Sequence, residues 1–365
     1  MRKVIVVTTL LLTMVGSAVA QTASKERVKY IREKYAEAKA QVAANGQNGM
    51  APLDATITLS NPEQIDEDFI LDDWTELKFY FNKYRTDPGL DYGNASSCYL
   101  VIENYASHGH TRYREILFDP NEGTLLFCYM KGVTDAGFEV ETRYYFGEDG
   151  KLVDQKHKVG GQDAAPGAHT WNDADSEKAT AKNYLAIFDA LMNSGNAAVN
   201  LFAGSTKTTP KAERMKTIRS AYAQARQQMA ADEKMEEPRY MKVVVHDQTM
   251  GPPYTIEMNY NFTQLRQGDE TKNHCYFISE HRHNNMMGMD IYREFLFDTK
   301  RVNLMFAYDV SHEEGEKFES RHYFDENNRC IEVIGQEEGE SEGSPERRMA
   351  QQYLKIFNLV ANATF

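Results

Sequence analysis

The feature that most constrains the fold of this 365-residue chain is an internal repetition in its sequence. Four blocks occur twice and in the same order, with short insertions between them. By first residue, the pairs are ERVKYIREKYAEAKA at Glu26 and ERMKTIRSAYAQARQ at Glu213, YREILFD at Tyr113 and YREFLFD at Tyr292, FEVETRYYFGEDGK at Phe138 and FESRHYFDENNR at Phe318, and NYLAIFDAL at Asn183 and QYLKIFNLV at Gln352. Chance does not repeat four blocks in order, so we expect two copies of one structural unit.

Each copy begins and ends with a helical pattern and carries strand patterns between the two. In the opening block apolar residues fall at helical spacing, as Val28, Ile31 and Tyr35 do. In the third block the period changes to two, so that Val140 and Tyr144 share one face of a strand. Turn sequences such as DPNEG and GEDG are typical of antiparallel neighbours. We therefore predict an α+β fold of two tandem repeats, each an antiparallel β-meander of about six to seven strands with a helix before it and a helix after it.

The first 20 residues have the layout of a cleaved secretory signal. Two basic residues precede an apolar run, and small residues follow it up to Ala20. We therefore expect cleavage near Ala20 and a periplasmic or secreted protein. The apolar run is shorter than the roughly 20 residues that a membrane-spanning helix needs, and no later stretch approaches that length, so membrane insertion is not expected.

After the signal at residues 1–20, the pattern divides the chain into two domains and a connector. The first repeat domain is predicted at residues 21–192 and the second at residues 213–365. The segment between them, residues 193–212, is rich in small and polar residues and includes Pro210 just before the second opening helix. Such a composition is typical of a partly flexible linker.

The acidic composition argues against two classes of partner. The formal charge of the full chain is −13, and the loss of Arg2 and Lys3 with the signal brings it to −15. A surface this negative repels phosphate backbones and anionic lipids, so nucleic acid and membrane surfaces are poor partners. Solubility is the simplest consequence of such a charge.

The sequence contains none of the short motifs that mark common catalytic chemistry. There is no G-x-S-x-G elbow, zinc-protease H-E-x-x-H, C-x-x-C pair, phosphate loop or dinucleotide glycine fingerprint. We therefore expect no enzymatic activity and no cofactor. A hydrolase that uses a pair of the 54 acidic residues is the alternative, and it would require a deep pocket that holds an acid with a raised pKa.

Two histidines one residue apart, His281 and His283, are candidate metal ligands. Residues two apart on a strand share a face, and the methionines that follow would offer soft ligands to copper. The earlier histidine pair, in SHGHTR, lies four residues further along its copy when both are counted from Cys98 and Cys275. Because the two pairs do not correspond, we favour a hairpin with an Asn-, Met- and Gly-rich turn over a metal site.

The cysteines leave two states open. In an exported chain Cys98, Cys128, Cys275 and Cys330 allow three disulfide pairings. Cys98 and Cys275 hold matching positions in the two copies, whereas the other two have no counterpart. Small or apolar residues stand opposite them, which favours buried packing cysteines over a reactive pair.

A set of charged and aromatic residues common to both copies is the candidate ligand-binding site. Arginine makes forked hydrogen bonds to carboxylates and phosphates, and Tyr and Arg are enriched at protein interfaces. The candidates are Glu141, Arg143, Tyr145 and Arg114 in the first copy and Glu319, Arg321, Tyr323 and Arg293 in the second. The structural alternative is a set of cross-strand ion pairs on the solvated face of a sheet.

Taken together, these features predict an exported, non-catalytic binding protein of the bacterial cell envelope whose ligand is an envelope protein, a peptide or a glycan. The alternatives are a carrier that holds an apolar small ligand between sheet and helix, and the carboxylate-dependent hydrolase. A lined cavity with few polar atoms would favour the carrier, whereas a packed core with an exposed aromatic patch would favour the binding protein.

Overall fold

The computed structural model describes most of the chain after the predicted signal sequence. The described residues are 24–47, 52–66, 69–71, 73–85, 94–107, 110–134, 137–165, 173–192, 209–235, 238–247, 254–267, 270–284, 288–299, 303–313, 316–335 and 344–362. The predicted signal sequence and most of the predicted linker lie outside these ranges, and so does the earlier histidine His108. Below, the first half means residues 24–192 and the second half residues 211–361.

The strands of both halves are long and follow one another closely along the chain. In the first half they are β1 (Asp54–Ser60), β4 (Trp74–Arg85), β5 (Asn94–Ser107), β6 (His110–Phe118), β7 (Leu125–Val133), β8 (Glu139–Phe146), β9 (Leu152–Val159) and β10 (Gln162–Asp163). In the second half they are β11 (Tyr240–Asp247), β12 (Tyr254–Gln267), β13 (Glu270–Asn284), β14 (Met289–Asp298), β15 (Asn303–Glu313), β16 (Glu316–Phe324) and β17 (Cys330–Ile334). A separate pair joins β2 (Glu63–Asp66) to β3 (Phe69–Leu71).

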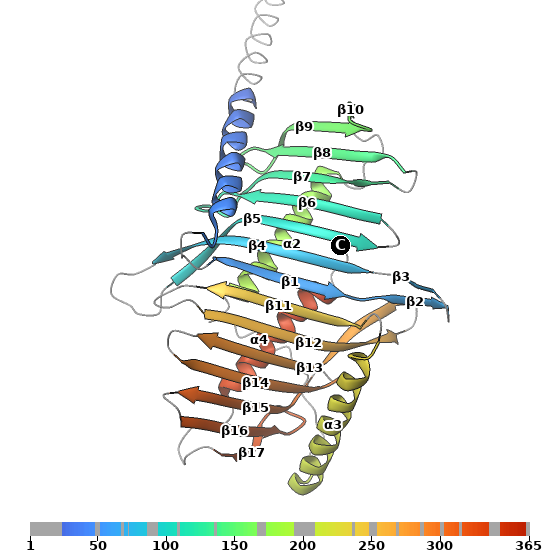
Figure 1. The fold of residues 1–365 in the computed structure, drawn as a ribbon, viewed down its shortest axis with the longest axis vertical. Coiled ribbons are helices and arrows are strands. Elements are labelled where there is room, and N and C mark those ends of the chain that lie inside the picture. Colours follow the sequence, from blue (N-terminus) through green and yellow to red (C-terminus); the bar gives the residue numbers. More distant parts are fainter. Residues whose placement is uncertain are drawn as a thin grey trace, which may run out of the picture.

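All fifteen strands of the first list and the second belong to one antiparallel sheet, in the order β10-β9-β8-β7-β6-β5-β4-β1-β11-β12-β13-β14-β15-β16-β17 (Figure 1). The predicted α+β class and the antiparallel meander are thus confirmed. The turn predicted at Gly147 joins β8 to β9, and Gly150 adopts a positive φ of 70° there, which favours glycine. On β8 the predicted buried face holds Val140, Thr142 and Tyr144.

The two halves meet edge to edge rather than as separate sheets. β1 pairs antiparallel with β11, so that Ile57 lies directly opposite Val243. His246 Nδ1 lies 2.9 Å from Asp54 Oδ1 across this junction. We expected a meander of its own for each half, and the structure instead has one continuous sheet. An uncovered strand edge leaves backbone N–H and C=O groups unpaired, and here each half covers the edge of the other.

Helices cover both faces of the sheet. In Figure 1, α2 (Ala174–Met192) and α4 (Ser344–Ala361) lie behind the sheet, where they contact each other. The first helix (residues 24–44) and α3 (Lys211–Asp232) lie in front of it, one over each half. Among the described helices none is long and apolar enough to cross a membrane.

Three hydrophobic clusters fill the space between these layers. The largest lies under α2 and α4 and is continuous across both halves, with Phe188 packed on Phe79 and Phe357 stacked on Tyr260. The second lies under the first helix and the third under α3, where Ile218 is buried. The face that carries the first helix and α3 thus holds two separate hydrophobic clusters, one under each helix.

Candidate ligand pocket

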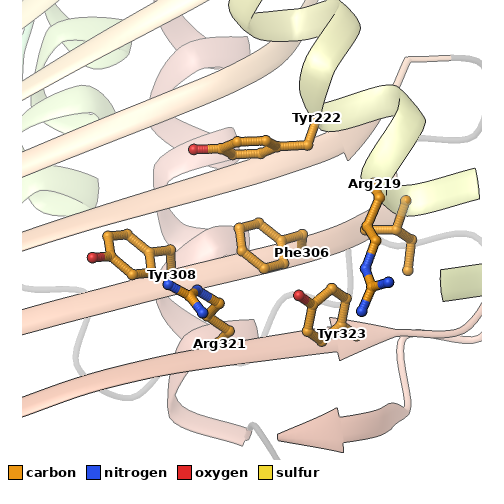
Figure 2. Close-up of a pocket in the computed structure, with 7 residues that line it drawn as sticks. Arg219, Tyr222, Phe306, Tyr308, Arg321 and Tyr323 are labelled. Carbon is orange, nitrogen blue, oxygen red and sulfur yellow. The ribbon is translucent and has the colours of Figure 1, made fainter. Parts of the chain in front are cut away.

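A surface pocket of about 410 Å³ lies between α3 and the strands β15 and β16. It is lined by Ile218, Arg219, Tyr222, Phe306, Tyr308, Arg321 and Tyr323, and we call it the Tyr–Arg pocket. Figure 2 shows Arg219 and Tyr222 reaching from α3 toward side chains that stand on two neighbouring strands. Its volume falls within the usual range of sites for small ligands, about 300 to 1,000 Å³.

Strand register builds the floor of this pocket. On β15, Phe306 and Tyr308 are two residues apart and therefore point to the same face. On β16, Tyr323 lies directly opposite Phe306, and Arg321 lies directly opposite Tyr308. The ring centroids of Phe306 and Tyr323 are 5.1 Å apart, and the Arg321 guanidinium lies 5.8 Å from the centre of the Tyr308 ring. Three aromatic rings and one guanidinium group thus pack side by side on the sheet.

Helical spacing builds the opposite wall. Ile218 and Tyr222 are four residues apart, so both face the sheet from α3. Tyr222 packs edge-on against Phe306 at a centroid distance of 5.3 Å. Arg219 follows Ile218 and stands at the rim, where its side chain is exposed. The pocket therefore has an aromatic interior and a positive rim.

A buried carboxylate fixes the hydroxyl of Tyr222. That hydroxyl donates to Glu294 at 2.5 Å, and the same carboxylate accepts from Tyr292 at 2.7 Å and from Arg226 at 3.2 Å. Burial, followed by the hydrogen bond to Glu294, raises the pKa of Tyr222 well above its usual value. The phenol thus stays protonated near neutral pH and serves to position the ring.

The two guanidinium groups of the pocket differ in their partners. Arg321 and Lys317 both pair with Glu319, and the Lys317 hydrogen bond lowers the pKa of that carboxyl. Arg321 uses one of its nitrogens for this pair and retains further N–H donors. Arg219 has no acidic partner within 4 Å among the described residues. None of the seven lining side chains is acidic, so the pocket favours an anionic group.

The same seven residue types recur at the corresponding places of the first half. They are Ile31, Arg32, Tyr35, Phe127, Tyr129, Arg143 and Tyr145, which we call the first-half site. The register repeats, since Phe127 lies opposite Tyr145 and Tyr129 lies opposite Arg143. The contacts repeat as well: Tyr35 packs on Phe127 at 5.0 Å, and the Arg143 guanidinium lies 5.2 Å from the Tyr129 ring centre.

One contact distinguishes the first-half site. The Arg32 guanidinium lies over the Tyr145 ring at 5.6 Å. Arg219 makes no such cation–π contact with Tyr323 in the part of the chain that the structure describes. The supporting carboxylate is repeated, because Glu115 accepts hydrogen bonds from Tyr35 and Tyr113 and from Lys39 at 2.8 Å.

Solvent-facing positions of the same two helices are alike only in part. Tyr30 and Glu33 of the first helix correspond to Thr217 and Ser220 of α3, and all four are exposed. Lys29 and Lys216, in contrast, are both exposed and identical although they line neither site.

The structure brings together four of the eight ligand-binding candidates. Arg321 and Tyr323 line the Tyr–Arg pocket, and Arg143 and Tyr145 hold the same places in the first half. Glu319 pairs with Arg321 on the same strand. In the first half Glu141 lies 3.2 Å from Arg143 in the same arrangement. Tyr145 and Tyr323 lie on the face opposite the main core, as predicted, but they are only 3% and 6% exposed because the first helix and α3 cover them.

Arg114 and Arg293, the other two candidate arginines, lie on the opposite face of the sheet. The Arg114 guanidinium lies 2.5 Å from Glu103 and 3.0 Å from Glu177 of α2. Arg293 lies 3.2 Å from Glu280 and also pairs with Asp309. They are held in ion clusters beneath α2 and α4, so a ligand on the pocket face does not reach them.

The two histidines of the metal hypothesis sit on β13. Their ring centroids are 5.3 Å apart, and His281 Nε2 lies 2.5 Å from Asp290 Oδ1. In the described ranges no group of three or more His, Cys, Asp or Glu side chains is arranged to hold a metal ion. Met286 and Met287, which would complete a copper site, lie outside those ranges.

All four cysteines are free thiols, so the structure contains none of the three disulfide pairings. Cys98, Cys128 and Cys275 are buried, and Cys330 is half-buried. Burial raises the pKa of each of these thiols. They act as small packing residues, the state that the residues opposite them favoured.

Sequence reasoning missed five of the seven lining residues: Ile218, Arg219, Tyr222, Phe306 and Tyr308. The helical spacing of Ile218 and Tyr222 predicts only a core-facing side of a helix, and no motif singles out Arg219, Phe306 or Tyr308. The signal that could have found them is their identity between the two copies, combined with strand parity. No family model, curated protein or solved structure matches this chain. Its function is therefore argued from the chemistry of the pocket.

Proposed function

We propose that this chain is an exported, non-catalytic binding protein of the bacterial cell envelope. In this proposal it is a tandem duplication that binds its ligand, a protein, peptide or glycan, in the Tyr–Arg pocket and in the first-half site. The observation that supports it is the recurrence of all seven lining residues in the first half. Two sites on one chain raise the avidity for a repetitive or multivalent partner without any new contact.

The chemistry of the lining favours binding over catalysis. Tyr and Arg dominate recognition surfaces, since they offer large contact area and directional donors. The lining set offers no carboxylate, imidazole, thiol or aliphatic hydroxyl that could act as base or nucleophile. Its one fully positioned hydroxyl, on Tyr222, is held protonated by burial and by Glu294, which keep its pKa raised.

The packing of the opposite face does not favour the carrier alternative. There the large side chains of α2 and α4 interdigitate with the sheet, and Tyr184, Ile187 and Phe188 are almost completely buried. A pocket of about 460 Å³ does lie beside α2, where Leu185 and Phe188 contribute to its wall. The rest of its lining is largely polar, since it includes Ser96, Ser97, Asn121, Glu122 and Asp189, and such a lining suits an apolar ligand poorly.

The test is an array of peptides and bacterial envelope glycans probed with the mature protein. The probing variant is Tyr129→Ala combined with Tyr308→Ala, which removes one half-buried ring from each site. The matched control is Tyr30→Ala combined with Tyr240→Ala, since these two rings are exposed, at 36% and 37%, and line neither site. We expect array binding to be lost in the first double variant and retained in the second. Binding that survives the loss of both pocket rings, or no binding at all, would contradict the proposal.

A further inference from the structure

The charge and shape of the Tyr–Arg pocket restrict the class of ligand further. We infer that it takes the C-terminal residue of a peptide, with the α-carboxylate on Arg219 and Arg321 and an apolar side chain on the aromatic floor. This inference rests on the proposed binding function and adds the ligand chemistry.

The first step concerns charge. The pocket offers two guanidinium groups and no acidic lining residue. Guanidinium groups recognise carboxylates through paired N–H donors, and such charge-assisted bonds are about twice as strong as neutral ones. Arg219 stands at the rim, and Figure 2 shows its side chain directed toward Tyr323, with Arg321 on the other side of that ring. In the inferred complex the carboxylate lies over Tyr323, with one guanidinium group on either side of it.

The second step concerns the interior. Beneath the rim lie Phe306, Tyr308 and Tyr323, and the side of the pocket is closed by Ile218 and Tyr222. These surfaces are apolar except for phenol oxygens, and the Tyr222 hydroxyl already donates to Glu294. An acidic sugar carries several hydroxyls that need acceptors, and this interior has few to offer. An apolar side chain needs none, because burial of its surface is favourable by itself.

The third step concerns geometry. In a C-terminal residue the carboxylate and the side chain branch from the same carbon, so a positive rim next to an apolar floor matches both at once. Backbone and basic groups that capture a C-terminal carboxylate are a recurrent mode of peptide recognition. The size of the pocket, about 410 Å³, limits the occupant to a terminal group.

The two sites of the chain are expected to differ in affinity. In the first-half site the Arg32 guanidinium lies over the Tyr145 ring. It must move away from this ring before a ligand side chain can pack there. An exposed cation–π contact of this kind weakens binding by about two- to fivefold. Charge acts in the same direction, because Glu139 on β8 occupies the place that Lys317 holds on β16.

The test measures fluorescence anisotropy of labelled pentapeptides against the mature protein. The probes are GSGAF as the free acid, the same peptide as the C-terminal amide, and GSGAS as the free acid; trigalacturonic acid serves as a competitor. We expect the amide and the serine-ended peptide to bind at least about tenfold more weakly than the GSGAF acid. Arg219→Gln should weaken the tighter binding event, which we assign to the Tyr–Arg pocket, by about tenfold. Arg32→Gln should change only the weaker binding event, at the first-half site.

Lys216→Gln is the control, because Lys216 is exposed on the same helix, carries the same charge and does not line the pocket. It should leave the affinity unchanged. Equal binding of the acid and the amide, or no binding of either, would refute the inference. Arginine-dependent binding of trigalacturonic acid without the peptide would also refute it but would leave the proposed binding function standing. The array experiment fails separately, when no probe of any class depends on Tyr129 and Tyr308.

Discussion

Replacing Arg114 by methionine should destabilise the fold far more than the same change at Arg293, although the two residues correspond in sequence. The Arg114 side chain is 1% exposed and lies between the carboxylates of Glu103 and Glu177, both of them 0% exposed. After the substitution, Arg112 at 3.7 Å is the one ion-pair partner that Glu103 keeps among the described residues. Removing one member of a buried ion pair costs about 3–5 kcal/mol, because it leaves buried charge uncompensated.

The environment of Arg293 is more forgiving. Its side chain is 16% exposed, and its partner Asp309 is 23% exposed, so water can replace the lost contact. Glu280 is fully buried but retains Arg282 at 3.0 Å. We therefore expect Arg293→Met to cost about 1–3 kcal/mol, in line with the loss of a hydrogen-bonded charge that keeps other partners.

The assay is urea unfolding of the mature protein, followed by circular dichroism and by fluorescence, with the slope m compared between variants. Arg143→Gln provides the third point, because its pair with Glu141 is about one-third exposed and should contribute only a few tenths of a kcal/mol. The expected order of destabilisation is thus Arg114, then Arg293, then Arg143. A loss below about 1 kcal/mol for Arg114→Met, or one no larger than that for Arg293→Met, would refute this interpretation of the buried clusters.

Three further predictions concern the pocket support, pH and the cysteines. Tyr222→Phe removes the hydroxyl that donates to Glu294, so the free energy of unfolding measured in urea should fall by about 1.5–3 kcal/mol. The affinity for GSGAF should stay within about twofold because the ring remains. A variant of unchanged stability that has lost this affinity would contradict the prediction. Burial raises the pKa of the thiols of Cys98 and Cys275 and of the phenols of Tyr222, Tyr276 and Tyr353. Stability should therefore fall as pH rises above about 8.5, where thiols of the unfolded chain ionise first, and more steeply above about pH 10, where its tyrosines do. Urea unfolding at stepped pH checks this, and stability that rises there would oppose it. Burial also raises the pKa of Cys98 and Cys275, so iodoacetamide should label them only after unfolding, and an intact mass about two daltons low would instead reveal a disulfide.

Much of the local structure could be predicted because short-range patterns determine it. The period of two on β8 placed Val140 and Tyr144 on one face, and the helical spacing of Ile31 and Tyr35 placed both toward the sheet. The continuous sheet could not be predicted in the same way. Pairing of β1 with β11 joins residues that are 180 to 192 positions apart in the sequence, and no local pattern records which edge will cover another.

The exposure of the site residues was harder to predict, because both faces of the sheet are covered where they lie. On β6 Arg114 lies at the same alternate positions as the core residues Ile116 and Phe118, but Leu117 between them is buried too. The alternation of residues along a strand therefore could not show which face of the sheet is exposed to solvent. The position of the first helix and α3 decides it, and that position follows from tertiary packing.

The two halves differ in part of their buried ion clusters, whereas the residue types that line the Tyr–Arg pocket are the same in both. In the first half Arg114 pairs with Glu177, and in the second Arg293 pairs with Asp309, which stands where the first half has Met130. Glu346, at the place of Glu177, instead lies 3.7 Å from His322.

These exchanges show that even fully buried positions tolerated a change of partner as long as the charges remained compensated. The charged residues at the centre of the clusters nevertheless keep their types, since Glu103, Arg114 and Glu177 correspond to Glu280, Arg293 and Glu346. Burial and charge balance are sufficient to explain that conservation. Arg219 and Arg321 are exposed side chains that contribute little to stability, yet their types are unchanged in Arg32 and Arg143. We propose that recognition of a ligand at both sites is the reason for their retention.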